Sequence, residues 1–200
     1  MLAEVIELND IRLSTEMLDL REEAIRLSGS EDAHEKKYPI YNWQRLQFTA
    51  DLLSAGDSIL DVGPGRGHMC NYLLRSGMFE NVCAIDIVNP NSHLDRRVNF
   101  EKRSVLELKV SDTRFISVLA LEILEHLDPT QVSEALRGLR RSASRDLIAT
   151  VPFCEPMPSK YHMQTFDTKL VETFFPSARK IVMLKRPVTR VPWILVHEML

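Results

Sequence analysis

The stretch over residues 58–74, SILDVGPGRGHMCNYLL, constrains the fold of this chain more than any other. An apolar run that carries a single acid, Asp61, leads into glycines at alternate positions, Gly63, Gly65 and Gly67. Apolar residues then resume at helical spacing, which predicts a strand, a tight turn and a helix ending near residue 76. Alternate glycines leave no side chain between such a loop and a ligand. The stretch therefore predicts a small-molecule site on bare main chain, and an ordinary glycine-rich turn is the simpler alternative.

The spacing of these glycines differs from the dinucleotide fingerprint G-x-G-x-x-G, because His68 stands where the third glycine belongs. A nicotinamide or flavin site is therefore disfavoured. The segment DVGPGRG instead resembles the first motif of class I S-adenosylmethionine-dependent methyltransferases, and the resemblance continues from about Tyr38 to the C-terminus. It implies S-adenosylmethionine as the cofactor, with its methionine part bound by residues of the loop: Asp61, Gly63, Gly65 and Gly67.

Length and charge limit the other classes of protein. A chain of 200 residues with 44% hydrophobic content predicts one domain. The formal net charge of -3 gives no positive field that would attract nucleic acid or an anionic membrane. Acids interrupt the first segment, and no apolar run approaches the ~20 residues of a membrane span, so we expect a cytoplasmic protein without a signal peptide.

The first 55 residues are expected to form a helical cap on a core that spans residues 56–200. Apolar spacing predicts an amphipathic helix from Ile11 to Leu27, with Ser14 or Thr15 as its N-cap. A polar joint follows, and Asn42 can begin a second helix. Three aromatic residues near that point either close over the cofactor or simply pack: Tyr38, Tyr41 and Trp43.

The remaining pattern predicts an α/β domain. Strands are expected over residues 59–62, 82–87, 98–102, 115–121, 146–151, 178–184 and 193–196. Further helices are expected to begin at Pro129-Thr130 and at Asp167. The resemblance implies a doubly wound, Rossmann-like sheet of seven strands in the order 3-2-1-4-5-7-6, with the last strand antiparallel and a hairpin over residues 185–192.

Residues at the ends of the second and third predicted strands are the candidates for the nucleoside part of the cofactor. Asp86 follows Gly67 by 19 residues and can accept hydrogen bonds from two ribose hydroxyls, although a loop-capping carboxylate is the alternative. Ile87 follows it directly and is placed with it at the cofactor. The resemblance puts adenine beside Ser104 and Val105, where the family usually carries an acid instead of the serine.

The fourth predicted strand runs into the sequence LEILEH, which resembles the fourth motif of the family. The resemblance places Leu121 and Glu122 near the methionine part of the cofactor or the methyl acceptor. A nitrogen or oxygen acceptor can need a base, and the candidates are Glu122, Glu125, His126 and His162, with Tyr161 as a positioning group. If the motif is helical, Glu122, Glu125 and His126 share one face.

Such an E-x-x-E-H motif can also ligate a divalent metal together with a further histidine, as in small-RNA 2′-O-methyltransferases. Ordinary family members carry it without metal, so no metal ligand is expected. The favoured function is methyl transfer from S-adenosylmethionine to a small-molecule, sugar or natural-product acceptor, without a membrane partner. A metal-assisted RNA 2′-O-methyltransferase and a non-catalytic S-adenosylmethionine-binding module are the alternatives. The acceptor and the oligomeric state stay open, with a dimer among the alternatives.

Overall fold

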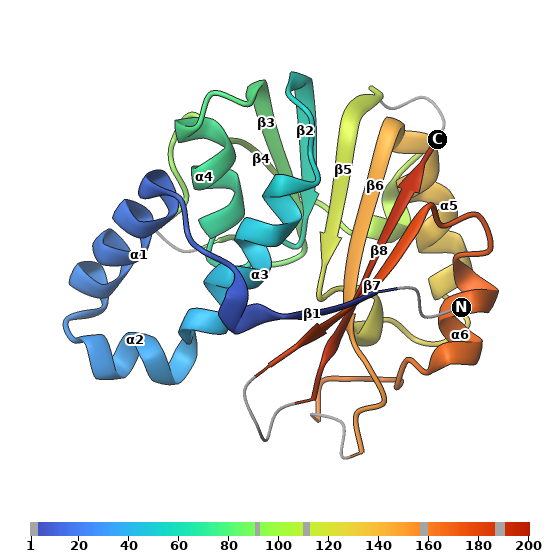
Figure 1. The fold of residues 1–200 in the computed structure, drawn as a ribbon. Coiled ribbons are helices and arrows are strands. Elements are labelled where there is room, and N and C mark those ends of the chain that lie inside the picture. Colours follow the sequence, from blue (N-terminus) through green and yellow to red (C-terminus); the bar gives the residue numbers. More distant parts are fainter. Residues whose placement is uncertain (1–3, 91–92, 110–112, 157–159, 187–190) are drawn as a thin grey trace.

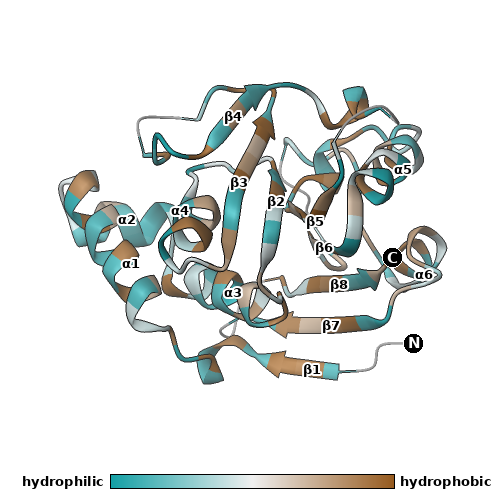
Figure 2. Cartoon of the chain, turned by 90° about the horizontal axis from the view of Figure 1, so that it is seen from above, coloured by the Kyte–Doolittle hydropathy of each residue, from teal (hydrophilic) through white to brown (hydrophobic). Residues whose placement is uncertain are grey.

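A mixed sheet of eight strands runs through the protein, whose computed structural model describes residues 4–90, 93–109, 113–156, 160–186 and 191–200 (Figure 1). The strands follow one another across the sheet in the order β1-β7-β8-β6-β5-β2-β3-β4, which Figure 2 shows from above. Their bounds are β1 Glu4–Glu7, β2 Gly56–Val62, β3 Phe79–Asp86, β4 Asn99–Lys102, β5 Phe115–Leu121, β6 Ala143–Pro152, β7 Lys180–Lys185 and β8 Trp193–Met199. Only β8 is antiparallel to its neighbours, β6 and β7.

The predicted doubly wound α/β fold is confirmed, with one strand more than expected. The predicted order 3-2-1-4-5-7-6 corresponds to β4-β3-β2-β5-β6-β8-β7. The predicted number of seven is wrong, because Glu4–Glu7 pairs in parallel with β7 as β1. The first 55 residues therefore contribute a strand as well as helices. The middle of the predicted hairpin, residues 187–190, lies outside the described residues.

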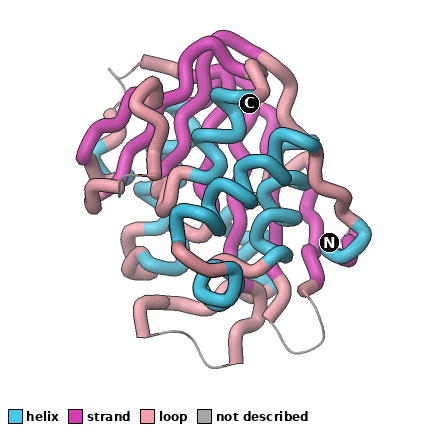
Figure 3. Tube along the Cα trace, turned by 90° about the vertical axis from the view of Figure 1, so that its left-hand side faces the viewer, coloured by secondary structure: helices cyan, strands magenta, loops and turns pink. Residues whose placement is uncertain are grey.

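Helices cover both faces of the sheet. On one side lie α1 (Thr15–Ser28), α2 (Glu31–Lys37), α3 (Ile40–Asp51) and α4 (His68–Arg75), and on the other α5 (Val132–Ser142) and α6 (Thr168–Phe174) (Figure 1). Figure 3 shows the first group from the front, with the strands behind it. Short 3-10 helices are η1 (Leu8–Asp10), η2 (Val105–Glu107) and η3 (Leu124–His126). Within the described part of the chain, no helix has the length and apolar character needed to cross a membrane.

The start of the chain differs from prediction where local capping decides the boundary. Ser14 is the N-cap of α1 and accepts a hydrogen bond from the Met17 N–H at 3.2 Å, so the helix starts later than Ile11. The polar joint that follows the first predicted helix contains α2, because Ser30 caps this helix in the same way. Helix α3 begins directly after Pro39 rather than at Asn42. Extended backbone at the proline sets the start of that helix.

The sheet separates two hydrophobic cores. One unites Met17, Leu20 and Trp43 of the N-terminal helices with sheet residues such as Leu119. The other lies under α5 and α6 and includes Leu136. The N-terminal helices therefore share a continuous core with the sheet.

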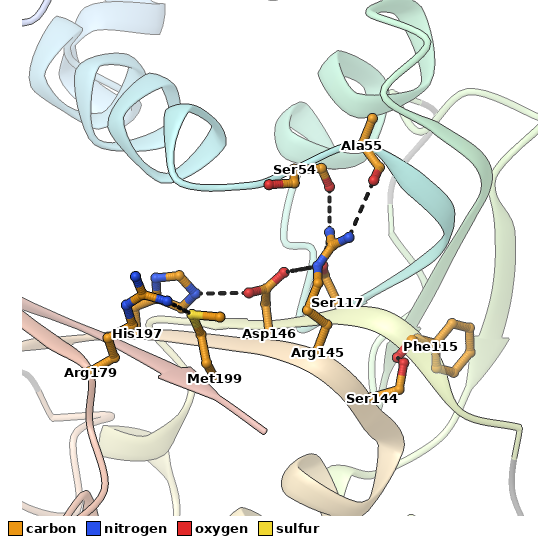
Figure 4. A network of polar contacts seen from close by, with 10 residues as sticks. All are labelled: Ser54, Ala55, Phe115, Ser117, Ser144, Arg145, Asp146, Arg179, His197 and Met199. Atoms are coloured by element: carbon orange, nitrogen blue, oxygen red, sulfur yellow. Dashed lines mark hydrogen bonds and ion pairs between the residues drawn. The ribbon is translucent and has the colours of Figure 1, made fainter.

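A polar network fixes the amino-terminal end of β6 (Figure 4). The carboxylate of Asp146 accepts hydrogen bonds from the Ser117 hydroxyl at 3.0 Å and from Arg145 Nε at 2.7 Å, and contacts His197 Nε2 at 3.0 Å. Arg145 also donates to the backbone carbonyls of Ser54 and Ala55. The network thereby ties the connection between α3 and β2 to the sheet, at the end opposite the glycine loop.

Candidate functional site

A cavity of about 210 Å³ lies at the carboxyl ends of β2 and β5. In open α/β sheets ligands bind at this edge, where the strand order reverses. Its lining includes Tyr38 and Arg45 from the α3 region, Asp61 and Gly65 from β2 and its loop, and Leu121 and Glu122 from the end of β5. Sequence reasoning had selected the last four of these six residues, and also Gly63, which lines the cavity too.

The three loop glycines all have positive φ, but for different reasons. A Cβ at Gly63 would lie 1.8 Å from Ile123 Cδ1, and one at Gly67 would lie 2.6 Å from Leu94 Cδ1. A Cβ at Gly65 would meet no atom within 4 Å. Packing of the protein itself therefore requires glycine at the outer two positions, whereas Gly65 leaves bare backbone beside the cavity.

Asp61 is a buried carboxylate in the wall of the cavity, with 2% of its surface exposed. Its one hydrogen bond to another described residue comes from the Cys70 thiol, at 3.2 Å. Burial raises the pKa of Asp61 to about 6, while the Cys70 hydrogen bond and Arg45 oppose the shift and the nearby Asp86 carboxylate adds to it. The site therefore holds a carboxylate whose negative charge is poorly compensated, and a cationic ligand group would stabilise it.

Asp86 is the last residue of β3 and lies next to the start of the glycine loop. The Gly63 N–H donates to the carbonyl of the preceding residue, Ile85, at 2.8 Å. One oxygen of its carboxylate accepts a hydrogen bond from the Val88 N–H at 2.9 Å. This is the loop-capping geometry that the sequence left as an alternative. The other oxygen has no partner among the described residues, so a ribose role stays a prediction. The neighbouring Ile87 is 65% exposed.

Ser104 and Val105 lie at the end of the next strand, close to Asp86, because the Arg103 N–H donates to the carbonyl of Asp86. The hydroxyl of Ser104 caps η2 and accepts from the Leu106 N–H at 3.2 Å, in a capping box with Glu107. Val105 is 7% exposed and belongs to the second core. Neither residue lines the 210 Å³ cavity described above, and their adenine role also stays a prediction.

Glu122 enters the cavity from a strained backbone position, with φ of 61°. A residue other than glycine rarely adopts this conformation. Its carboxylate forms an ion pair with Arg45 at 3.4 Å and accepts a hydrogen bond from Trp193 Nε1. These contacts hold the side chain of Glu122 toward the cavity.

Arg45 is a site residue that sequence reasoning missed. It is 6% exposed, donates to the Thr150 hydroxyl at 2.8 Å, and its guanidinium lies 4.6 Å from the centre of the Trp193 ring. The available signal was a cation at position 45 of a predicted helix, three and seven residues before the apolar Phe48 and Leu52, a spacing that puts all three on one face. A cation on a buried face needs a partner. Glu122 supplies that partner.

The three aromatic residues around the start of α3, Tyr38, Tyr41 and Trp43, differ in whether they pack in the core or line the cavity. Trp43 is fully buried in the first core and packs on the ring of His68 at 4.5 Å, so its role is packing. His68 is itself buried, and burial is the main cause that lowers its pKa to about 3, so it stays neutral. Tyr38 lines the cavity, whereas Tyr41 packs against the ring of Trp193.

The E-x-x-E-H motif does not form one helical face, because Glu122 precedes the short helix η3. Instead, Glu125 and His126 meet His162 from the segment after β6, and the two imidazole ring centres are 5.0 Å apart. Glu125 is 1% exposed, and burial, followed by the nearby Glu122 carboxylate, raises its pKa well above the ordinary range. Glu122 therefore lines the cavity, whereas His126 and His162 form a separate cluster with the buried Glu125 and are not among the lining residues.

A sequence profile described as a methyltransferase domain matches residues 32–151, which is more than half of the chain. No curated protein sequence matches.

Three solved structures illustrate the similarity of fold. N-methyltransferase NodS from Bradyrhizobium japonicum WM9, in complex with S-adenosyl-L-homocysteine, has a TM-score of 0.71 and 12% identity, covering 90% of this chain and 97% of that one. The 1,6-didemethyltoxoflavin-N1-methyltransferase of Burkholderia thailandensis has a TM-score of 0.61 and 17% identity, covering 96% and 79%. The methyltransferase domain of bacterial CtHen1 has a TM-score of 0.61 and 16% identity, covering 80% and 99%.

The family profile begins before α3 and ends within β6, so it spans the glycine loop, Asp86 and the E-x-x-E-H motif. S-adenosylmethionine is the cofactor of methyltransferases with this fold. The chain belongs to the class I S-adenosylmethionine-dependent methyltransferases.

Proposed function

We propose that this protein transfers a methyl group from S-adenosylmethionine to a small-molecule acceptor, such as a sugar or a natural-product intermediate. The observation that carries the proposal is the cavity in which bare backbone at Gly65 faces two carboxylates, Asp61 and Glu122. The cofactor's methionine end carries an ammonium group beside its sulfonium. The Asp61 carboxylate, which has only a thiol donor, is suited to stabilise such a cationic group, and Glu122 adds a second negative charge that Arg45 partly offsets.

The proposed roles follow the strand ends. The loop residues Asp61, Gly63, Gly65 and Gly67 would surround the methionine part, and Leu121 would pack beside it. A cavity of about 210 Å³ holds only part of an adenosyl ligand. The nucleoside would therefore extend along the strand ends, with its ribose at Asp86 and Ile87 and its adenine at Ser104 and Val105.

The chain's own contribution to the reaction is mainly positioning. A sulfonium methyl is already electrophilic, so holding the acceptor in line and excluding water supply much of the acceleration. Glu122 reaches the cavity, and His126 and His162 would meet the acceptor from the neighbouring cluster that they form with Glu125. Each of them can take a proton from an oxygen or nitrogen acceptor.

The neighbour that was crystallised with bound 1,6-didemethyltoxoflavin supports a small-molecule acceptor. A net charge of -3 supports the same choice over RNA. An RNA acceptor predicts, in contrast, binding to RNA that weakens steeply as salt rises. A non-catalytic module predicts cofactor binding without turnover of any acceptor.

Calorimetric titration with S-adenosylmethionine and S-adenosylhomocysteine tests the proposal. We expect saturable binding of both, weakened about ten-fold or more by Asp86→Ala, because a charge-assisted hydrogen bond contributes ~1.5–3 kcal/mol. Asp57→Ala is the matched control, since this exposed acid lies at the opposite end of β2. Absence of binding by the unaltered protein would refute the proposal, and equal affinities for both variants would remove Asp86 from the site.

A further inference from the structure

A second cavity, of about 260 Å³, lies between the helices α1 and α2 and the start of α4. Its lining joins small residues of α1 and α2 to four basic side chains, and the full set is Ala24, Ser28, Ala33, Lys37, Arg66, His68 and His93. None of these described lining residues is acidic. The proposed function gives this cavity no role, and its basic lining predicts a negatively charged ligand.

The two cationic side chains of the lining, Lys37 and Arg66, form no ion pair or hydrogen bond with any other described residue. Two acids of α2, Glu31 and Glu35, do not line the cavity and are both engaged by Arg21 of α1. Their negative charge is therefore compensated elsewhere. A bound anion would supply the counter-charge that Lys37 and Arg66 lack within the described protein.

Buried histidines at this cavity also lack partners. His68 lines the cavity, and its Nε2 is buried without a hydrogen-bond partner among the described residues, as is Nδ1 of His34, whose ring centre lies 6.2 Å away. Burial is the main cause that lowers the pKa of both, and the charge of Arg66 adds to it in each case. Buried polar atoms without a partner often mark a place that a ligand or an ordered water completes.

Hydrogen bonds within the protein fix both walls of the cavity. On one side, the buried Asn71 of α4 donates to the carbonyl of His93 at 2.7 Å and accepts from the Asp95 N–H at 2.9 Å. On the other side, Arg21 joins α1 to Glu35 of α2. The basic side chains are therefore carried by anchored backbone, which lowers the entropy cost of binding a ligand.

We propose that this cavity binds the phosphate or carboxylate group of a small molecule, as a ligand additional to the methyltransferase cofactor. Arg66 would bind the group through two parallel hydrogen bonds, Lys37 would supply a second positive charge, and His93 can donate a further hydrogen bond. The volume is slightly below the ~300–1,000 Å³ that is typical of small-molecule pockets, which suits a compact organic anion.

The second cavity adjoins the cofactor cavity, because Arg66 and His68 line both. The consequence of this proximity rests on the proposed function. The positive charge of Arg66 opposes a cationic sulfonium nearby, and a bound anion would offset that charge. An occupied anion site is therefore expected to favour S-adenosylmethionine over S-adenosylhomocysteine, whose thioether is neutral.

Calorimetric titration of the full chain at constant ionic strength tests the site. The probes are inorganic phosphate, glycerol phosphate and succinate, which distinguish a phosphate ligand from a carboxylate ligand. We expect one equivalent of at least one probe to bind, with a Kd of about 1 mM or tighter. Arg66→Gln is expected to weaken this binding about ten-fold or more and Lys37→Gln about three-fold, because each removes a charge-assisted hydrogen bond.

Arg96→Gln and Lys36→Gln are the matched controls, since these exposed cations do not line the cavity. Circular dichroism checks that each variant is folded. Lys37→Glu, at an exposed position, provides a second test should Arg66→Gln fail to fold, and it is expected to abolish binding. No saturable binding of any probe, or equal binding by the control and the cavity variants, would overturn the site.

The same titrations in the presence of cofactor separate the two cavities. We expect the best-bound probe to tighten S-adenosylmethionine about five-fold more than S-adenosylhomocysteine. Displacement of the probe by S-adenosylhomocysteine would show that the cavity holds the carboxylate of the cofactor itself, and would overturn a separate site. Cofactor binding without anion binding would refute this inference alone, whereas anion binding without cofactor binding would refute the proposed function.

Discussion

Two buried carboxylates, Asp146 and Glu125, differ in their hydrogen-bond partners and in the direction of their pKa shifts. Asp146 is 4% exposed and lies among Ser117, Arg145 and His197 (Figure 4). Burial alone would raise its pKa, but the hydrogen bonds from these partners outweigh it and the pKa is lowered. Glu125 is 1% exposed, its carboxylate has no hydrogen-bond partner among the other described residues, and its pKa is raised.

The Asp146 carboxylate therefore stabilises the fold, whereas the Glu125 carboxylate is left available to a ligand. Asp146 lies at the amino ends of the strands, far from the glycine loop, and its contacts join three segments. Glu125 lies at the carboxyl ends, where the strands present the cofactor cavity. Proteins keep uncompensated buried charge mainly at functional sites, where perturbed pKa values concentrate.

The largest effect is expected for Asp146→Ala. The variant leaves Arg145 and His197 without their shared acceptor, and removal of one partner from a buried ionic network costs about 3–5 kcal/mol. Denaturant unfolding monitored by circular dichroism measures the loss in free energy of unfolding, with the exposed Asp57→Ala as control. A change below ~1 kcal/mol would contradict the structural role given to this carboxylate.

Asp61 is an intermediate case, with a single thiol donor and a pKa of about 6 against an ordinary value of 3.8. A raised pKa means that the folded state holds its proton more tightly, so the stability contributed by Asp61 is full below pH 3.8 and is lost as pH rises through about 6. The loss amounts to about 3 kcal/mol.

Unfolding free energies measured from pH 4 to pH 7 check this sign, with Asp61→Asn as the reference that cannot ionise. As pH increases, the free energy of unfolding of the unaltered protein should fall relative to that of Asp61→Asn. A difference that is constant with pH would show that Asp61 ionises normally in the folded protein.

The smallest of these effects is expected for Glu125→Leu, and its sign is opposite to that of Asp146→Ala. Replacing an unpartnered buried carboxylate with an apolar side chain of similar size should raise the free energy of unfolding by ~1–3 kcal/mol in the presence of a chelator. Denaturant unfolding measures the gain, and Glu134→Leu on the exposed face of α5 is the matched control. Destabilisation by Glu125→Leu would show that the Glu125 carboxylate, like that of Asp146, stabilises the fold, and would contradict the distinction between the two carboxylates.

Features that depend on local sequence patterns could be predicted from the sequence. Alternate glycines after an apolar run predicted the loop at Gly65, and apolar segments ending in polar residues predicted the strands and their edge. Asp167 was correctly predicted to cap α6, because its carboxylate accepts from the Leu170 N–H. Such features depend on residues within a few positions of one another.

Features that depend on distant contacts could not be predicted. Gly63 is required by the side chain of Ile123, which belongs to another strand end. Arg45 reaches Glu122 only because α3 packs against the end of β5. His162 meets Glu125 through main-chain hydrogen bonds between two loops, and no spacing in the sequence records them.

The edge strand β1 has a consequence for how the chain completes its fold. Glu4–Glu7 pairs with β7, and its two acids form ion pairs with Lys180 and Lys185 at 2.9 and 3.0 Å. During synthesis, β1 must wait until β7, far behind it in the chain, has been made before the two can pair. Until then β1 has no strand partner, and once β7 is made the short, charged β1 covers its outer edge and protects it against pairing with another extended chain.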